Sequence, residues 1–151
     1  MKTVGNVLWF LFGGLVAGLL WWIAGVLMYI SIIGIPWGKA CFTIGKLAFF
    51  PFGKEAIDRD KLTGKKDIGT GSWGTLGNII WFIFSGIWLA LSHASAGIIS
   101  FITIIGIPFG IQHFKLAGIS FFPIGKEVVP KEVAEEARRK DAERKVEDYR
   151  S

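Results

Sequence analysis

Two long apolar blocks dominate the chain, with a polar segment after each. The first block runs from about Gly5 to Phe52 and has no charged residue before Lys39. The second runs from about Trp73 to Ile124 and has none before Lys115. About 20 apolar residues suffice to cross a bilayer core of roughly 30 Å. Both blocks exceed that length, and neither has the polar stripe of a surface helix. The pattern therefore predicts an integral membrane protein.

The two blocks are copies of each other at a constant offset of 72 residues. Ile-Ile-Gly-Ile-Pro-x-Gly occurs at residues 32–38 and again at 104–110. Phe-Phe-Pro-x-Gly-Lys-Glu occurs at 49–55 and at 121–127, and roughly two fifths of the aligned positions are identical. An internal repeat sets the architecture of a chain, so each copy is expected to be one membrane unit.

Each block is too long for one ordinary helix, and proline starts helices well but interrupts them badly. We therefore predict long first helices over residues 6–33 and 78–105. Shorter second helices begin near Pro36 and Pro108 and end before Pro51 and Pro123. A helix of about 15 residues spans about 22 Å, so it can cross obliquely, re-enter or lie at the interface. The predicted turn residues are Gly34, Pro36, Gly38, Gly106, Pro108 and Gly110.

Basic residues in the polar segments predict the orientation. Lys and Arg are abundant in the segment after each block, and such segments stay in the cytoplasm. Each repeat is then a hairpin, and the two hairpins are parallel, related by an axis along the membrane normal. Both termini are expected to be cytoplasmic. The predicted divisions are membrane repeat 1 (1–53), a cytoplasmic loop (54–72), membrane repeat 2 (73–125) and a cytoplasmic tail (126–151).

The tail reads as a helix that begins at Pro130. Glu135 and Arg139 stand four residues apart, as do Glu136 and Lys140, and such pairs stabilise a helix in water. Its apolar residues form only a weak stripe. A solvated helix and a helix that docks a partner both fit. The fold class is thus an all-α integral membrane protein with two tandem hairpins and a C-terminal helix.

Composition agrees with the membrane assignment and locates unusual charges. The chain is 52% hydrophobic, carries a net charge of +5 and has a single cysteine, which excludes an intrachain disulfide. Lys39, Lys46 and Lys115 lie in apolar blocks that contain no Asp or Glu. A charge at a bilayer centre costs about 2.5–3.5 kcal/mol. These lysines either reach lipid phosphates through their long stems or line a water-filled path that favours anions.

Further polar residues extend the candidate pore or anion-binding site. Gln112 and His113 lie beside Lys115, and His93 lies in a small polar stretch of the preceding helix. Asn6 and Asn78 occupy equivalent positions and are expected to cap the first helices. A polar ring at a pore mouth is the alternative role for the two asparagines.

No enzyme constellation occurs in the sequence. Paired carboxylates in an apolar setting, a phosphate-binding glycine loop and a Ser-His-Asp arrangement are all missing. We expect no catalytic activity, no cofactor, no metal and no nucleic-acid partner.

The doubled Ile-Gly-Ile-Pro-x-Gly and Phe-Phe-Pro-x-Gly-Lys-Glu elements, with Gly-Asn at 5–6 and 77–78, resemble the YccF family of bacterial inner-membrane proteins. The resemblance covers about residues 1–130. It implies a location in the bacterial inner membrane and two tandem copies of one domain. It brings no catalytic or ligand residues to this chain.

Two functions fit these observations. The leading hypothesis is a small anion-preferring channel, formed by a homo-oligomer because four short helices are too few to enclose a path. The alternative is a non-conducting scaffold or accessory subunit that binds lipid headgroups or a larger transporter, which would be a second membrane protein. Membrane lipids are expected partners in both.

Overall fold

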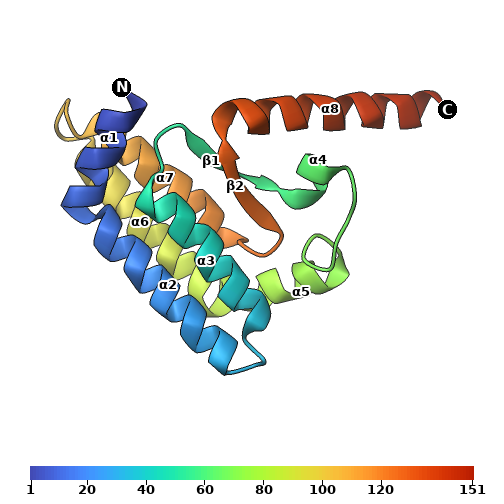
Figure 1. Cartoon of the computed structure of the whole chain (residues 1–151), viewed down its shortest axis with the longest axis horizontal. Helices are drawn as coiled ribbons and strands as arrows, with labels where there is room; N and C mark the ends of the chain where they lie inside the picture. The colour runs from blue at the N-terminus through green and yellow to red at the C-terminus, as the bar shows by residue number, and fades with distance from the viewer.

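The computed structural model describes residues 1–151 and consists of two helical hairpins joined by a short β-ribbon (Figure 1). Repeat one contains α1 (Lys2–Trp9), η1 (Phe10–Gly14), α2 (Leu15–Ile30) and α3 (Ile35–Phe49). Repeat two contains α5 (Ser72–Trp81), η2 (Phe82–Gly86), α6 (Ile87–Ser100) and α7 (Ile107–Phe121). In each repeat the first three elements form one continuous outer helix, and the last is the shorter inner helix.

The inner helices lie where the sequence predicts them, but the outer helices are displaced toward the N-terminus. They run from Lys2 to Ile30 and from Ser72 to Ser100, not over residues 6–33 and 78–105. The Gly-Asn pairs do not start helices. At the other end, residues 31–34 and 101–106 are used in the turns of the hairpins.

The predicted turn residues occupy equivalent places in both repeats. Gly34 immediately precedes α3, and Pro36 lies in its first turn, where a missing N–H costs no hydrogen bond. A Cβ atom added to Gly38 would lie 2.8 Å from the Tyr29 ring, so a small residue lets the inner helix approach α2 closely. The same three roles in repeat two belong to Gly106, Pro108 and Gly110.

Strands β1 (Lys54–Asp58) and β2 (Lys126–Pro130) form an antiparallel ribbon that the all-α prediction did not contain. The first strand and a short helix, α4 (Arg59–Thr63), lie in the segment predicted to be a loop. The fold is therefore mostly helical with a two-stranded element. Each strand is only five residues long and gains its hydrogen bonds from a segment about 70 residues away, so no local pattern marks it.

The register of this ribbon relates the two repeats. Ala56 and Val128 are equivalent in the repeat, and they stand directly opposite each other. Lys54 pairs with Pro130 and Lys126 with Asp58, which are exchanged by the same offset. A pseudo-two-fold axis therefore passes between Ala56 and Val128, perpendicular to the ribbon.

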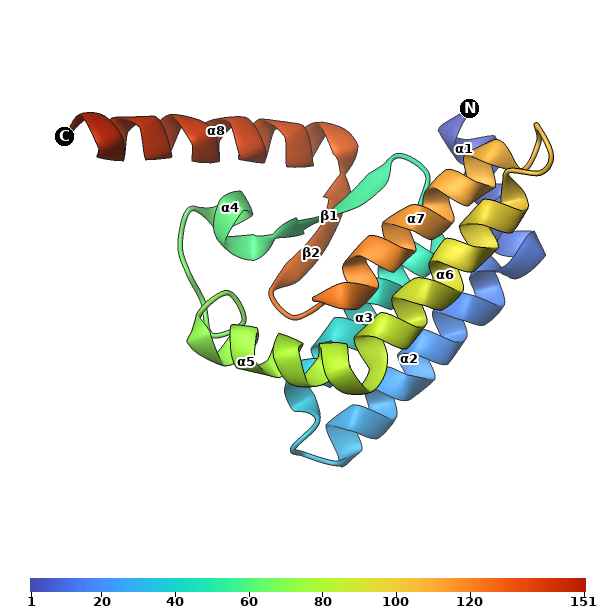
Figure 2. The same cartoon turned by 180° about the vertical axis from the view of Figure 1, so that it is seen from behind.

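The two-fold axis places the tip of each hairpin beside the base of the other (Figures 1 and 2). Trp9 and Gly13 line a cavity together with Thr103, near the tip of hairpin two. Tyr29 and Trp73 line another cavity at the opposite end. The hairpins consequently run in opposite directions across the molecule, with α3 and α7 closest to the ribbon.

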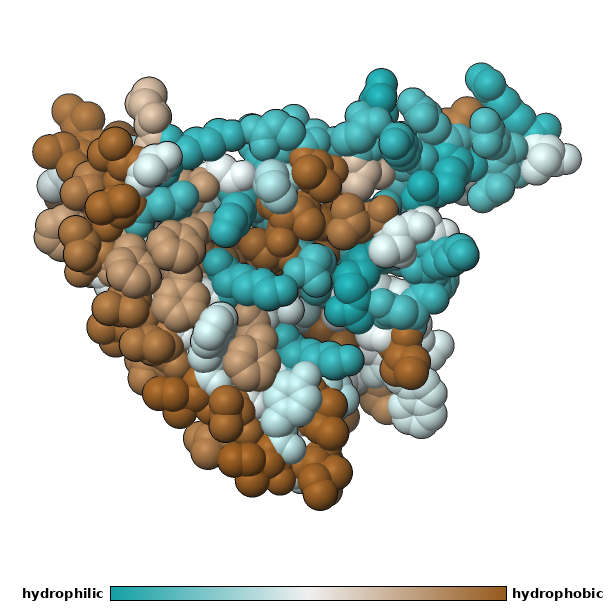
Figure 3. Space-filling model, viewed as in Figure 1, coloured by the Kyte–Doolittle hydropathy of each residue, from teal (hydrophilic) through white to brown (hydrophobic).

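The ribbon separates an apolar layer from a polar layer. Ala56 and Val128 pack against the helical core, which includes Leu47 and Leu116. Ile57 and Val129 face the other way and hold the first turns of α8 (Lys131–Arg150) through Ala134 and Ala137. Beyond those turns α8 is exposed, so the tail is partly docked and partly solvated. Figure 3 shows hydrophilic residues over the ribbon and α8, and hydrophobic residues over α1 and α2.

Asn6 and Asn78 do not cap helices, contrary to the prediction. Asn6 lies inside α1, where its Nδ2 donates to the carbonyl of Phe52 at 3.1 Å and its Oδ1 accepts the N–H of Phe52 at 2.9 Å. Asn78 makes the same two bonds with Ile124, at 3.0 and 2.9 Å. Each asparagine thus fastens the turn after an inner helix to the outer helix of its own repeat.

Replacing either asparagine by alanine should destabilise the fold. The substitution leaves one backbone donor and one acceptor of a partly buried turn without partners, at about 1–3 kcal/mol. We expect Asn6→Ala and Asn78→Ala to lower the free energy of unfolding by that amount in detergent, measured by chemical denaturation. Ser92→Ala is the control, since Ser92 is exposed and bonds only within its own helix. Unchanged stability of both asparagine variants would contradict the clamp.

Candidate functional site

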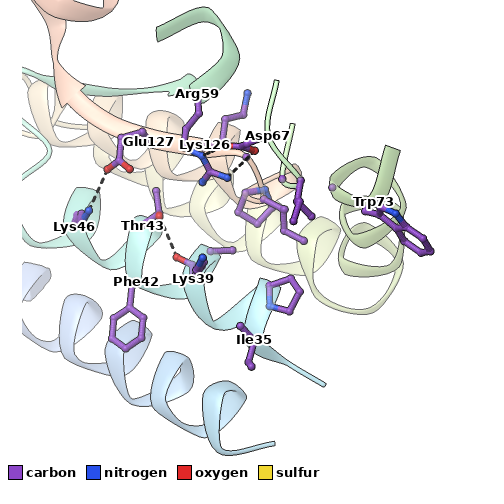
Figure 4. A pocket seen from close by; sticks show the side chains of 18 of the residues that line it. Ile35, Lys39, Phe42, Thr43, Lys46, Arg59, Asp67, Trp73, Lys126 and Glu127 are labelled. Carbon is purple, nitrogen blue, oxygen red and sulfur yellow. Dashed lines mark hydrogen bonds and ion pairs between the residues drawn. The ribbon is translucent and has the colours of Figure 1, made fainter. Parts of the chain in front are cut away.

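A cleft of about 680 Å³ lies between α3, the start of β2 and the segment at residues 67–74 (Figure 4). We call it the basic cleft, because four basic side chains outnumber two acidic ones among its polar residues: Lys39, Lys46, Arg59, Lys126, Asp67 and Glu127. Its apolar walls include Tyr29, Phe42, Ile68 and Trp73. The cleft therefore joins a positive surface to an apolar one.

Two of the predicted lysines come from one face of α3. Lys39 and Lys46 are seven residues apart, two helical turns, and both line the cleft. Lys46 Nζ lies 3.1 Å from Glu127 Oε1. Lys39 is exposed and has no acidic partner within ion-pair distance. Lys39 is thus the cation of this face whose charge is free to meet an anion.

Arg59 and Asp67 fix the rim of the cleft. The guanidinium donates two hydrogen bonds to the carboxylate, at 2.7 and 3.1 Å. These bonds, aided by the N–H of Thr70, lower the pKa of Asp67 to about 2, and the carboxylate raises the pKa of Arg59. Both groups are therefore charged at neutral pH and hold residues 67–70 against the cleft.

Lys126 is held at the far wall by Asp58. Burial alone would raise the pKa of the Asp58 carboxyl, but hydrogen bonds from Lys126 and Lys61 outweigh it and lower that pKa. The ion pair leaves Lys126 with little uncompensated charge. The positive potential of the cleft thus centres on Lys39.

Lys115, the third predicted lysine, lies outside the basic cleft. Its Nζ donates to the carbonyls of Pro51 and Lys54 of repeat one, at 3.2 and 3.1 Å. Gln112 is buried one turn away, and its Nε2 donates to the carbonyl of Pro108 at 3.0 Å while its Oε1 has no partner. These two residues join the repeats and are not assembled with Lys39 and Lys46.

His93 and His113 form a separate pair between α6 and α7. Their Nδ1 atoms are 3.3 Å apart, so one ring donates the hydrogen bond and the other accepts it. Both rings line a second cavity of about 500 Å³, beside Trp9 and Phe109. No third ligating side chain joins them. The structure thus divides the predicted site residues among three places.

Sequence reasoning missed the polar segments' share of the cleft, which includes Arg59, Asp67, Trp73 and Glu127. One signal was present. The repeated Gly-Lys-Glu motif puts charged residues directly after each apolar block, at the depth where the lysines of α3 emerge. The pairing of Arg59 with Asp67 depends on the loop conformation and has no such signal.

Two tandem apolar hairpins, two helices long and apolar enough to cross a bilayer and a polar layer along one side define a small membrane protein with a duplicated domain. The chain belongs to the YccF family. The family model, described as an inner membrane component domain, matches residues 4–54 and again residues 76–126. This confirms the two tandem copies and the inner-membrane assignment.

Relatives of nearly equal length support the same family. Inner membrane protein YccF of Escherichia coli (strain K12) is 42% identical over 148 residues, which cover 97% of this chain and 100% of the relative. Inner membrane protein YccF of Shigella flexneri matches with the same identity and coverage. No solved structure matches the chain.

The Arg59–Asp67 pair should make the rim of the cleft sensitive to acid. The pKa of Asp67 is about 2, below its ordinary value of about 3.9, so the contribution of the pair is complete above pH 4 and is lost as the pH falls toward 2. An exposed pair contributes about 0.5–1 kcal/mol. We expect Asp67→Asn to speed amide exchange of residues 67–70 about two- to fivefold at neutral pH, measured by mass spectrometry.

Wild type and Asp67→Asn should then exchange alike, relative to intrinsic rates, near pH 2. A rate difference that persists at that pH would mean that the rim is held by contacts other than this pair.

Proposed function

We propose that the protein is a non-conducting component of the bacterial inner membrane that binds phospholipid headgroups in the basic cleft. The observation that carries the proposal is the position of Lys39. Its unpaired ammonium lies where a positive cleft meets an apolar surface, and a phospholipid has the same division between phosphate and acyl chains. Lysine stems of this kind pack on apolar surface while the ammonium reaches a phosphate.

The layered fold supports a membrane orientation for this function. In it, the two-fold axis lies along the membrane normal, the ribbon and α8 face the cytoplasm, and α2 and α6 face the lipid. Basic residues are concentrated in the polar layer, as expected for a cytoplasmic surface. Both hairpins then enter from the same side, as the sequence predicts, and both termini are cytoplasmic.

The hairpin tips favour re-entry over full crossing. Ile32 and Ile33 are 74% and 83% exposed at the first tip, and Ile104 and Ile105 are 87% and 82% exposed at the second. Neither tip holds a charged residue. Such surfaces are stable in hydrocarbon and costly in water. In the proposal both tips therefore stay within the bilayer, and the basic cleft lies at the level of the cytoplasmic headgroups.

The channel hypothesis finds less support in the geometry. Its positive path needs Lys39, Lys46, His113 and Lys115 on one surface. Lys115 points to backbone carbonyls of the other repeat, and His113 points to His93. A lumen would have to come from several copies of the chain. Lipid binding needs only one copy, and the exposed part of α8 leaves room for the accessory role beside a larger membrane protein.

Neutralising the lysines of α3 should weaken lipid binding. We expect Lys39→Gln with Lys46→Gln to reduce the affinity for phosphatidylglycerol about tenfold, the equivalent of roughly 1.4 kcal/mol. Native mass spectrometry with short-chain lipid measures it. Lys65→Gln is the matched control, because Lys65 is exposed and lies outside the cleft. Equal affinity of all three proteins would sink the proposal, and lysine-dependent chloride flux in liposomes would support the channel.

The re-entrant arrangement predicts how the tips react with thiol reagents. In a Cys41→Ala background, Ser31→Cys and Thr103→Cys should resist a membrane-impermeant maleimide added from the periplasm. Lys65→Cys should react only after the cytoplasmic side is exposed. Rapid periplasmic labelling of either tip would show that its hairpin crosses the membrane.

A further inference from the structure

Repeat two shows what the turn after an inner helix can bind. The turn at residues 51–54 has two carbonyl oxygens, of Pro51 and Lys54, that accept hydrogen bonds from the Lys115 ammonium at 3.2 and 3.1 Å. Lys115 reaches this turn from α7, across the boundary between the repeats. The chain thus supplies its own primary ammonium as the ligand of the turn.

The pseudo-two-fold axis carries this turn onto residues 123–126, which border the basic cleft. Both turns read Pro-x-Gly-Lys. Both glycines adopt the left-handed conformation that glycine favours, with φ of +77° at Gly53 and +87° at Gly125. The same internal hydrogen bond closes each turn, from the N–H of the lysine to the carbonyl of the proline, at 3.2 and 3.3 Å. The carbonyl oxygens of Pro123 and Lys126 therefore repeat the arrangement that binds an ammonium.

The basic cleft lacks the lysine that would fill this position. The counterpart of Lys115 in the repeat is Thr43, whose Oγ1 donates to the carbonyl of Lys39 at 3.0 Å. No side-chain donor reaches the carbonyl oxygen of Pro123 or of Lys126. Lys46 lies one helical turn beyond Thr43 and pairs with the Glu127 carboxylate instead. A cleft lined by Thr43, Pro123 and Lys126 thus has room for an ammonium from outside.

We propose that the basic cleft selects phospholipids whose headgroup ends in a primary ammonium, the phosphoethanolamine class. This inference rests on the proposed headgroup binding and names the ligand. The ammonium of the lipid takes the place that Lys115 Nζ holds in repeat two, on the carbonyls of Pro123 and Lys126. Its phosphate meets Lys39, the cation without an acidic partner.

The chemistry of the site distinguishes this headgroup from the alternatives. A primary ammonium has three N–H donors for the two carbonyls, and the Glu127 carboxylate beside them adds negative charge. A trimethylated ammonium carries the charge but has no N–H to donate. A glycerol headgroup has hydroxyl donors but no positive charge. The cleft has groups of both signs, as a zwitterionic headgroup requires.

The first test uses the wild-type protein and three lipids with identical short acyl chains. We expect phosphatidylethanolamine to bind about tenfold more tightly than phosphatidylcholine and more tightly than phosphatidylglycerol, measured by native mass spectrometry of the full chain. Phosphatidylglycerol bound as well as phosphatidylethanolamine would overturn the selectivity and leave headgroup binding intact. Binding of none of the three would overturn the proposed function as well.

The second test moves the arrangement of repeat two into repeat one. Thr43→Lys places an ammonium on the carbonyls of Pro123 and Lys126, so the preference for phosphatidylethanolamine over phosphatidylglycerol should vanish, with phosphatidylglycerol still bound. Thr43→Ser keeps the hydroxyl and the space, and it should keep the preference. A folded Thr43→Lys protein with the wild-type preference would contradict the proposed position of the ammonium.

Discussion

The fold depends on the backbone pairing of two five-residue strands. Because Ala56 stands opposite Val128, the antiparallel ladder forces the two repeats into a two-fold relation. Neither strand can be formed within its own repeat. The ribbon also divides the molecule, since one of its faces covers the helical core and the other holds α8. A short polar element therefore sets both the symmetry and the polar side of a largely apolar protein.

The duplicated contacts show which parts of the repeat are structural. The Trp9 indole donates to the carbonyl of Ala48 at 2.7 Å, and Trp81 makes the equivalent bond to Ser120 at 2.9 Å. The asparagine clamps are duplicated in the same way. Where the repeats differ, one copy satisfies its turn internally and the other leaves it open. Lys115 and Thr43 are such a pair, and the difference turns a structural contact into a candidate binding site.

The sequence predicted the elements that depend on long local signals. Both hairpins and the ends of the inner helices follow from apolar length and from the repeated Gly-Ile-Pro and Phe-Phe-Pro elements. The ribbon could not be predicted, because each strand takes its partner from the other end of the chain. Asn6 was misread for a related reason, since its hydrogen bonds go to Phe52, 46 residues away.

The candidate site was only partly visible in the sequence. Lys39 and Lys46 stood out because they are charges within an apolar block, and helical spacing placed them on one face. The same reasoning grouped Lys115 with them, although the fold turns it toward the other repeat. Its contacts depend on how two turns meet across the pseudo-two-fold axis, and a single sequence carries no signal of that meeting.

Solid-state NMR of the lysine-labelled protein in phosphatidylethanolamine bilayers would examine the basic cleft most directly. Magnetisation transfer from lysine side-chain nitrogens to lipid phosphorus reports which ammonium groups lie beside a phosphate. Headgroup binding predicts strong transfer from Lys39, weak transfer from the exposed loop residue Lys65, and loss of the strong signal in Lys39→Gln. Equal transfer from both lysines, or none from Lys39, would contradict a headgroup in the cleft.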